Sequence, residues 1–254
     1  MKKNMLYIKK YSGFIISIVI GLLLYEEANY AYTYRTATAY SDHMIYRLIL
    51  SMGSGSSGWN GILFPILAVL HMGISYVREY RGGYLKLRLQ KMSRKRYVAV
   101  TLIQNAILGG LSLLIPYAVY CLHLYFQYGT KAYLNIKEGE TVIMFYPKLA
   151  ASNTIAYVCL LGAFVLLAGV TFATFAIGIS AWIKNTFLTL ILPFVLCIAM
   201  AILIPDNRFD LLLIFAPNGY AWASVPIILI MSGILILTGI ILFAVGVKKE
   251  YANL

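Results

Sequence analysis

The sequence predicts an all-α polytopic membrane protein with six transmembrane helices, and three observations lead to that prediction. Hydrophobic residues make up 61% of the 254 residues and charged residues only 12%, far from the composition of a soluble domain. The apolar residues gather in runs of about 20, the helix length that crosses a bilayer core of about 30 Å. Basic residues outnumber acidic residues by 21 to 9, and most of them flank these runs. We therefore expect residues 1–254 to form a single transmembrane domain.

Each predicted span is an apolar run bounded by charged or polar residues. The third run is long and contains Pro116, where a bend is expected, and the fifth contains Pro193. The third and fourth runs exceed one bilayer thickness, which predicts tilted helices or protruding ends. The six predicted spans are Ser12–Ala28, Ser57–Val77, Tyr97–Phe126, Ala151–Ile183, Phe187–Ile204 and Ala221–Val247.

The basic residues divide unequally between the two sides of these spans. With the termini, residues 78–96 and Lys184 on one side, that side carries 15 of the 21 basic residues. Short loops rich in Lys and Arg remain in the cytoplasm. Both termini are therefore predicted to be cytoplasmic, with residues 29–56, 127–150 and 205–220 outside. Because this topology accounts for most of the positive charge, no nucleic-acid partner is expected.

The N-terminus fits two interpretations. Four lysines between positions 2 and 10 precede a short apolar run, which resembles a secretory signal peptide, and Ala37 and Ala39 resemble a cleavage site. These alanines lie well beyond the end of the apolar run, whereas a signal peptidase site normally follows it closely. We therefore expect a retained helix, preceded by an interfacial segment whose lysines face lipid headgroups.

Residue patterns that would support catalysis or cofactor binding do not assemble in this sequence. The three cysteines stand singly in apolar runs, which excludes a disulfide framework and a cysteine metal site. Gly53 to Gly58 spell GxGxxG, but the motif leads from a loop into a span rather than from a strand into a helix. Glu26 and Glu27 resemble the paired glutamates of the prenyl-protein protease family, although Ala31 stands where that family has arginine. No catalytic residue, metal or cofactor is therefore expected on this chain.

Histidine and tyrosine each leave two interpretations open. His71 lies within the second apolar run, where a lone histidine more often makes a helix-to-helix hydrogen bond than binds a ligand. The 21 tyrosines cluster where spans meet water, as in an aromatic belt. The alternative for the tyrosines is a vestibule that handles amphipathic ligands.

Residues 78–96 form the most informative segment. The chain leaves the second span with a charged run, turns at Gly82-Gly83, and enters the third span after a basic cluster. Between the turn and that cluster lies a short amphipathic stretch, predicted to be a helix. It either lies at the membrane interface or docks in an apolar groove of a cytosolic partner. Its apolar residues are Leu85, Leu87, Leu89 and Met92.

This segment resembles the loop between helices two and three of the ABC-2 family of ABC transporter permeases. In that loop a Glu and a Gly precede alternating leucines and a Ser-Arg pair. Met92 stands near the position where the family often has proline, and a lysine often seen in the family has no counterpart near Thr101. The residues that match the pattern are Glu79, Gly83, Leu85, Leu87, Leu89, Ser93 and Arg94.

The resemblance extends over the whole chain, through six spans and both termini inside. It includes the outer segment from Pro205 to Tyr220, where the family places short outer helices. The apolar stretch Leu211 to Ala216 is too short to cross a bilayer and is followed by a Pro-Asn-Gly turn. A half-inserted outer helix is expected there.

The resemblance implies the permease subunit of an ATP-driven exporter in the bacterial cytoplasmic membrane. A second permease subunit, identical or different, and two separate ATPase chains would complete it, with ATP bound by the ATPases and residues 79–96 coupling them to the membrane. Because spans two and five flank the route in the family, Phe64, His71, Cys197 and Met200 are candidate pore residues. The almost uncharged route favours a hydrophobic or amphipathic substrate, a peptide or antimicrobial first and a drug or lipid otherwise.

Two other classes of function remain as alternatives. The first is a non-transport membrane assembly or sensor protein whose basic loop binds lipid or a cytosolic partner. An intramembrane enzyme is the second.

Overall fold

The computed structural model describes residues 2–35, 43–54, 59–71, 73–130, 145–204 and 206–252, and every regular element within these ranges is helical. Five helices are long and apolar enough to cross a membrane: α1 through its Ser12–Tyr30 part, α6, α8, α9 and α11. The chain is therefore a multi-pass membrane protein. The elements in chain order are α1 (Lys2–Arg35), α2 (Met44–Ile49), η1 (Leu50–Ser54), α3 (Trp59–Val69), α4 (Ser75–Arg81), α5 (Tyr84–Lys91), α6 (Arg94–Tyr128), α7 (Pro147–Ser152), α8 (Thr154–Ile183), α9 (Thr186–Leu203), η2 (Asn207–Phe209), α10 (Leu212–Phe215), η3 (Pro217–Gly219) and α11 (Val225–Ala252).

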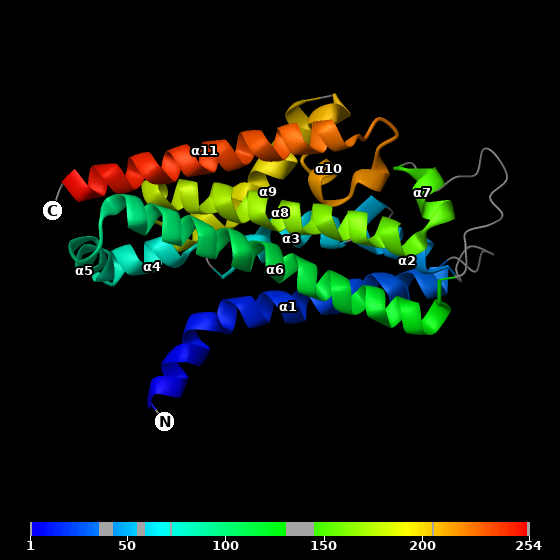
Figure 1. Cartoon of the computed structure of the whole chain (residues 1–254), viewed down its shortest axis with the longest axis horizontal. Helices are drawn as coiled ribbons and strands as arrows, with labels where there is room; N and C mark the ends of the chain where they lie inside the picture. The colour runs from blue at the N-terminus through cyan, green and yellow to red at the C-terminus, as the bar shows by residue number, and fades with distance from the viewer. Residues whose placement is uncertain are drawn as a thin grey trace.

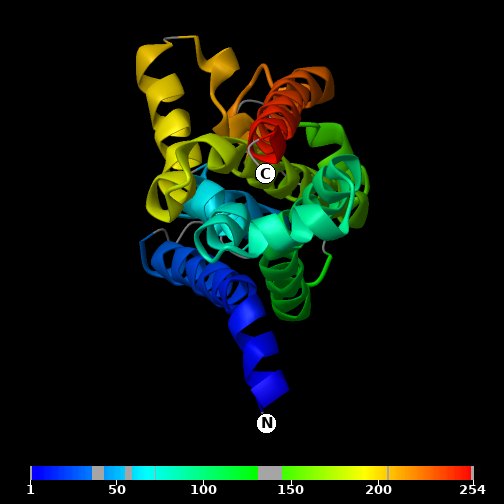
Figure 2. The same cartoon turned by 90° about the vertical axis from the view of Figure 1, so that its left-hand side faces the viewer.

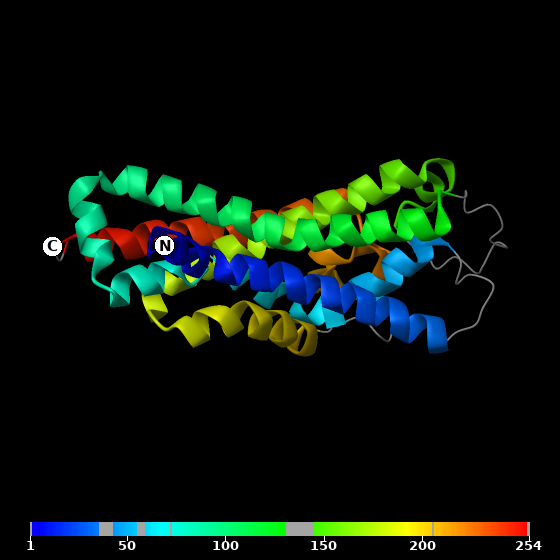
Figure 3. The ribbon, with the colours of Figure 1, turned by 90° about the horizontal axis from the view of Figure 1, so that it is seen from below.

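The long helices run side by side along the longest axis of the molecule (Figures 1 and 3). Helix α8 is central and contacts α6, α11, α3 and α9, while α1 packs against α6 and α3. Helix α5 and the C-terminus lie at one end of the bundle, called the α5 end below, and α2 and α7 lie at the opposite end, the α7 end (Figure 1). In the view along the bundle, α9 is peripheral and the first turns of α1 project away from the other helices (Figure 2).

The segment predicted as the second span is divided, so the prediction of one continuous helix over residues 57–77 is wrong. Among the described residues, those between α3 and α4 form turns. The Leu67 carbonyl, near the end of α3, accepts hydrogen bonds from the hydroxyls of Ser17 on α1 and Ser112 on α6. Side chains that bond into the helical backbone are a common cause of kinks. Non-helical backbone persists at membrane depth where protein covers it, as α1 and α6 do here.

The remaining predicted spans correspond to single helices. Helix α1 begins ten residues before and ends seven residues after the predicted span, and the other four differ from the prediction by at most five residues at either end. Helix α8 begins at Thr154 rather than Ala151, because the Asn153 side chain accepts the Ala156 amide at 3.0 Å and caps the helix. The residues before this cap form the separate helix α7. Helix α11 begins four residues later than predicted and continues to Ala252. The possible cleavage site at Ala37 and Ala39 lies outside the described residues.

Two clusters of buried side chains hold the helices together. The larger one lies toward the α7 end and joins α1, α3, α6 and α8 to the short helices α2 and α10. The smaller one lies at the α5 end and joins α4 and α5 to α6, α8 and α11. Its buried members are Tyr76, Leu85, Leu89, Tyr97, Ile177, Ala181, Phe243 and Val247.

Candidate functional site

Helices α4 and α5 form a tight hairpin at the α5 end, called the α4–α5 hairpin below. Gly83 links the two helices with φ of 73°, in the left-handed region that side chains other than glycine seldom adopt. A Cβ at this position would meet no atom within 4 Å, so the backbone conformation alone favours glycine. The glycine pair noted in the sequence is thus the turn that folds α5 back against the bundle.

Helix α5 presents its leucines to two different environments. Leu85 and Leu89 are each 3% exposed and belong to the buried cluster at this end, whereas Leu87 is 54% exposed. Residues four apart share a face of a helix, and the residue midway between them lies about 200° around the axis from each. The three alternating leucines therefore have separate roles: Leu85 and Leu89 anchor the helix, and Leu87 faces outward.

The carboxylate of Glu79 connects three helices. It forms an ion pair with Arg88 of α5 and accepts a hydrogen bond at 3.0 Å from the hydroxyl of Tyr97 in α6. The Arg88 guanidinium also lies 5.9 Å from the centre of the Tyr97 ring. Glu79 therefore holds the hairpin together and is not available as an isolated charge.

The Ser-Arg pair begins helix α6. Ser93 is its N-cap, and its hydroxyl accepts a hydrogen bond from the Arg96 amide at 3.4 Å. Arg94, the first helical residue, is half-buried. These two residues set where α6 starts, directly after the hairpin.

A basic and partly apolar surface covers the outward side of the hairpin. Its apolar members are Tyr80, Tyr84 and Leu87, which are 38%, 65% and 54% exposed. Glu79 is the only acidic residue among residues 75–96, and it is already paired with Arg88. We call this surface the α5 patch; its exposed polar members are Arg81, Lys86, Gln90, Lys91, Lys95 and Arg96.

Lys184, which the sequence showed only as a topology charge, lies at the centre of the contacts beneath the hairpin. Its ammonium forms an ion pair with Glu250 near the end of α11 and lies 4.1 Å from the centre of the Tyr80 ring of α4. Its carbonyl accepts a hydrogen bond from Arg81 Nε at 3.3 Å. Burial by itself lowers the pKa of this ammonium, but the hydrogen bonds to Glu250 and Tyr80 outweigh burial and hold the pKa above its ordinary value.

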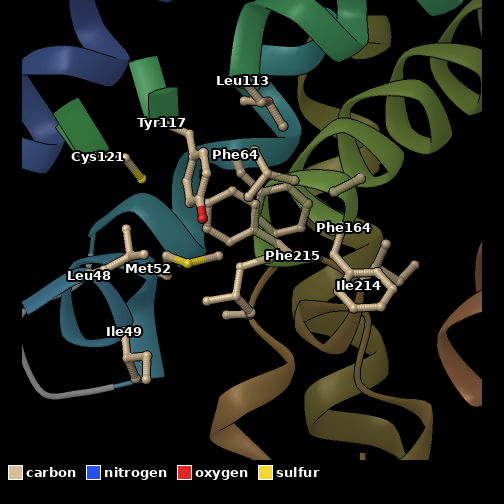
Figure 4. Close-up of a cluster of buried hydrophobic side chains, with 14 of the residues drawn as sticks. Leu48, Ile49, Met52, Phe64, Leu113, Tyr117, Cys121, Phe164, Ile214 and Phe215 are labelled. Atoms are coloured by element: carbon tan, nitrogen blue, oxygen red, sulfur yellow. The ribbon is translucent and has the colours of Figure 1, made fainter. Parts of the chain in front are cut away.

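The candidate pore residues fall into two groups in the structure. Phe64 is 1% exposed and stacks on Phe215 with ring centres 4.6 Å apart, as Figure 4 shows. Cys197 and Met200 of α9 are partly buried against the same large cluster. His71 lies elsewhere, 3% exposed, with its ring 5.8 Å from that of Phe14 on α1. The structure therefore brings three of the four near one cluster and separates His71 from them.

The segment between α9 and α11 reaches back into the bundle at the α7 end. The three consecutive side chains from Leu213 to Phe215 in α10 are at most 2% exposed. Asp210 accepts hydrogen bonds from the Leu212 amide at 2.8 Å and from the Tyr220 hydroxyl, which connects the start of this short helix to the residue after η3. A short helix is present here, as expected, and its contact with Phe64 is the feature that sequence reasoning missed.

Within the described parts of the chain, no group of three or more His, Cys, Asp or Glu residues is placed to hold a metal ion. No protein-family model, curated protein or solved structure matches this chain.

Proposed function

We propose that this chain is the membrane-spanning permease subunit of an ATP-driven exporter of the ABC-2 type, located in the bacterial cytoplasmic membrane. The observation that carries the proposal is the α4–α5 hairpin, a short helix anchored by Leu85 and Leu89 that presents Leu87 to the outside. An anchored helix with an exposed apolar ridge suits an apolar groove on a cytosolic partner. All the residues that resemble the ABC-2 loop lie on this hairpin or at the first residues of α6.

In this proposal the α5 end faces the cytoplasm, because most of the basic residues belong to that side. Two separate ATPase chains bind and hydrolyse ATP and dock on the α5 patch. A second permease subunit, identical or different, completes the membrane part. Movement of the ATPases displaces the hairpin and switches access between the two sides of the membrane.

The proposed substrate is hydrophobic or amphipathic. Phe64, Cys197 and Met200, which lie on the helices expected to flank the route, are all uncharged. A charge at the bilayer centre costs about 2.5 to 3.5 kcal/mol even on the insertion scale, so an apolar route disfavours charged cargo. A peptide or antimicrobial is the favoured substrate, and a drug or a lipid is the alternative.

The proposal is tested by replacing Leu87 with Asp and measuring how much of a tagged ATPase carrying Walker motifs co-purifies with the chain. A carboxylate forced into an apolar groove loses its hydration, so we expect binding to weaken by about 100-fold. Gln90→Asp is the matched control, because it introduces the same charge on the exposed side of the same helix without removing an apolar side chain. We expect that variant to retain its partner.

A non-transport assembly or sensor protein is the second candidate, and the exposed basic residues of the α5 patch favour it. Such a surface also suits anionic lipid headgroups, to which each basic residue contributes about 1 kcal/mol. If lipid were the occupant, Leu87→Asp and Gln90→Asp would weaken binding to vesicles containing phosphatidylglycerol to a similar extent, and no ATPase would co-purify with the unaltered chain.

A further inference from the structure

Besides the buried cluster at this end, two contacts connect the α4–α5 hairpin to the turn at Lys184, and a third connects that turn to α11. Tyr80 packs its ring on the Lys184 ammonium, the Arg81 side chain binds the Lys184 carbonyl, and the Lys184 ammonium pairs with Glu250. Lys184 lies between α8 and α9, and Glu250 lies near the end of α11. We call this group of four residues the Lys184 contact.

The connection of the hairpin to α3, its neighbour in sequence, is interrupted instead. Helix α3 ends at Val69 and α4 begins at Ser75, with turns among the described residues between them. The hairpin and α3 therefore do not form one continuous helix. The buried cluster connects the hairpin to α8 and α11, with Tyr76 and Phe243 ring centres 5.4 Å apart, and the Lys184 contact connects it to the start of α9.

The turn at Lys184 is built to hold the start of α9. Lys184 has φ of 52°, the left-handed conformation that favours glycine or asparagine, yet the position is occupied by lysine. The next residue, Asn185, caps α9 by accepting the amides of Phe187 at 3.0 Å and Leu188 at 3.3 Å. Both residues of the turn are thus fixed, and movement of Lys184 moves the first turn of α9.

Helix α9 contacts α8, α3 and η2 and is the least buried of the long helices, so this turn is one of the points that fix its start. Its buried residues are Thr189 and Pro193, and the rest of the helix is partly or fully exposed. Glycine would adopt the backbone conformation of Lys184 more easily, but it has no side chain to contact Tyr80 of α4 and Glu250 of α11. The side chain of Lys184 therefore has a role of its own at this position. We propose that Lys184 is the positioning residue through which a displacement of the α4–α5 hairpin reaches α9 and the end of α11.

This proposal rests on the proposed function for its biological meaning, but its first test needs no partner. Hydrogen exchange is measured on the full chain in nanodiscs of phosphatidylethanolamine and phosphatidylglycerol. In K184M and in E250Q, exchange should become about tenfold faster both in residues 75–91 and in residues 186–190. The charge-swapped variant K184E/E250K should return both segments to within about threefold of the unaltered chain.

The variant K184G separates the side chain from the backbone strain. Glycine relaxes the left-handed turn, so a defect caused by strain would disappear in K184G. The proposal expects K184G to exchange as fast as K184M in both segments. Unchanged exchange in K184M, or faster exchange confined to one of the two segments, would overturn it.

A second measurement uses the chain together with its ATPase. K184M changes no side chain of the α5 patch, although Tyr80 loses its contact with the ammonium, so we expect the ATPase still to co-purify while ATP hydrolysis loses its response to substrate. K184E/E250K should regain that response. If the unaltered chain binds no ATPase, the proposed function fails, and the hydrogen-exchange result still decides the role of Lys184.

Discussion

Helices α8 and α9 follow each other in the chain and are both almost entirely apolar, yet 50% of the most apolar stretch of α8 is buried and only 11% of that of α9. Glycine makes the difference. A Cβ on Gly169 of α8 would lie 2.4 Å from the Gly109 carbonyl oxygen of α6, and one on Gly178 would lie 2.5 Å from that of Gly239 in α11. Backbones in direct contact hold α6, α8 and α11 together as one unit, called the glycine-packed unit below.

The comparison teaches that hydrophobicity does not decide which membrane helix is held by its neighbours. Lipid tails are as apolar as leucine, so burial of a leucine against another helix yields little over burial in lipid. Small residues allow close approach and therefore determine the packing. Helix α9 lacks glycine, and most of its side chains remain partly or fully exposed.

The largest expected effect comes from breaking the glycine-packed unit. In Gly239→Ala the added Cβ would lie 2.4 Å from the Thr174 carbonyl oxygen, which forces two backbones apart. We expect a loss of about 3 kcal/mol in the free energy of unfolding, measured by titration with SDS in mixed micelles. Gly233→Ala on the same helix is the control, since its Cβ would meet no atom within 4 Å and should leave stability unchanged or raise it by up to about 1 kcal/mol. Equal effects of the two substitutions would contradict this account of the packing.

The division between α3 and α4 provides a second, smaller test. Replacing both Ser17 and Ser112 with Ala removes the two hydroxyls that bond to the Leu67 carbonyl. A buried carbonyl without a donor costs about 1 to 3 kcal/mol, so we expect a loss of about 2 kcal/mol in the same titration.

Ser180→Ala is the matched control for the serine pair. Ser180 is also buried, and its hydroxyl bonds to the Ile177 carbonyl of its own helix, as the Ser112 hydroxyl does to the Gly109 carbonyl at 2.7 Å. Ser180 therefore makes the bond within a helix and lacks the bond between helices. Its removal should cost less than about 0.5 kcal/mol. If the paired serine substitution is no worse than this control, the serines do not stabilise the break.

The features that sequence reasoning predicted correctly are those determined by neighbouring residues. Apolar run length located five helices, with α9 placed to within one residue at each end. The glycine pair located the turn at Gly83, and the amphipathic stretch located α5. Each of these depends on backbone propensity or hydropathy within a few positions, which a single sequence shows directly.

The features that could not be predicted from the sequence depend on residues far apart in the chain. The break after α3 is stabilised by Ser17 and Ser112, which lie 50 and 45 positions from Leu67. Lys184 pairs with Glu250 across 66 positions. The separate roles of Leu85, Leu87 and Leu89 could have been predicted from the sequence, because residues two positions apart do not lie on the same face of a helix.

Capping offers a third comparison, between the start of α9 and the start of α6. Asn185 accepts two backbone amides, whereas Ser93 accepts one at 3.4 Å. Because α9 has few other contacts, we expect Asn185→Ala to destabilise its first turn by about 1 kcal/mol, seen as faster hydrogen exchange in residues 186–190. Ser93→Ala should change exchange at the start of α6 by less, and the reverse order would show that tertiary packing outweighs the caps.

The smallest expected effect is that of pH on the pairing of Lys184 with Glu250, which should not change near neutral pH. The pKa of Lys184 is raised in the folded protein, so its pairing with Glu250 contributes fully below the ordinary lysine pKa of about 10.4 and is lost only as the pH rises through the higher folded pKa. We measure the difference in hydrogen exchange of residues 75–91 between the unaltered chain and K184M, corrected for intrinsic exchange. That difference should stay constant from about pH 7 to about pH 9 and disappear only as the pH rises beyond the ordinary lysine pKa and through the higher folded pKa. A difference that shrinks below pH 9 would mean that a group other than the Lys184 ammonium holds the α4–α5 hairpin to the turn before α9.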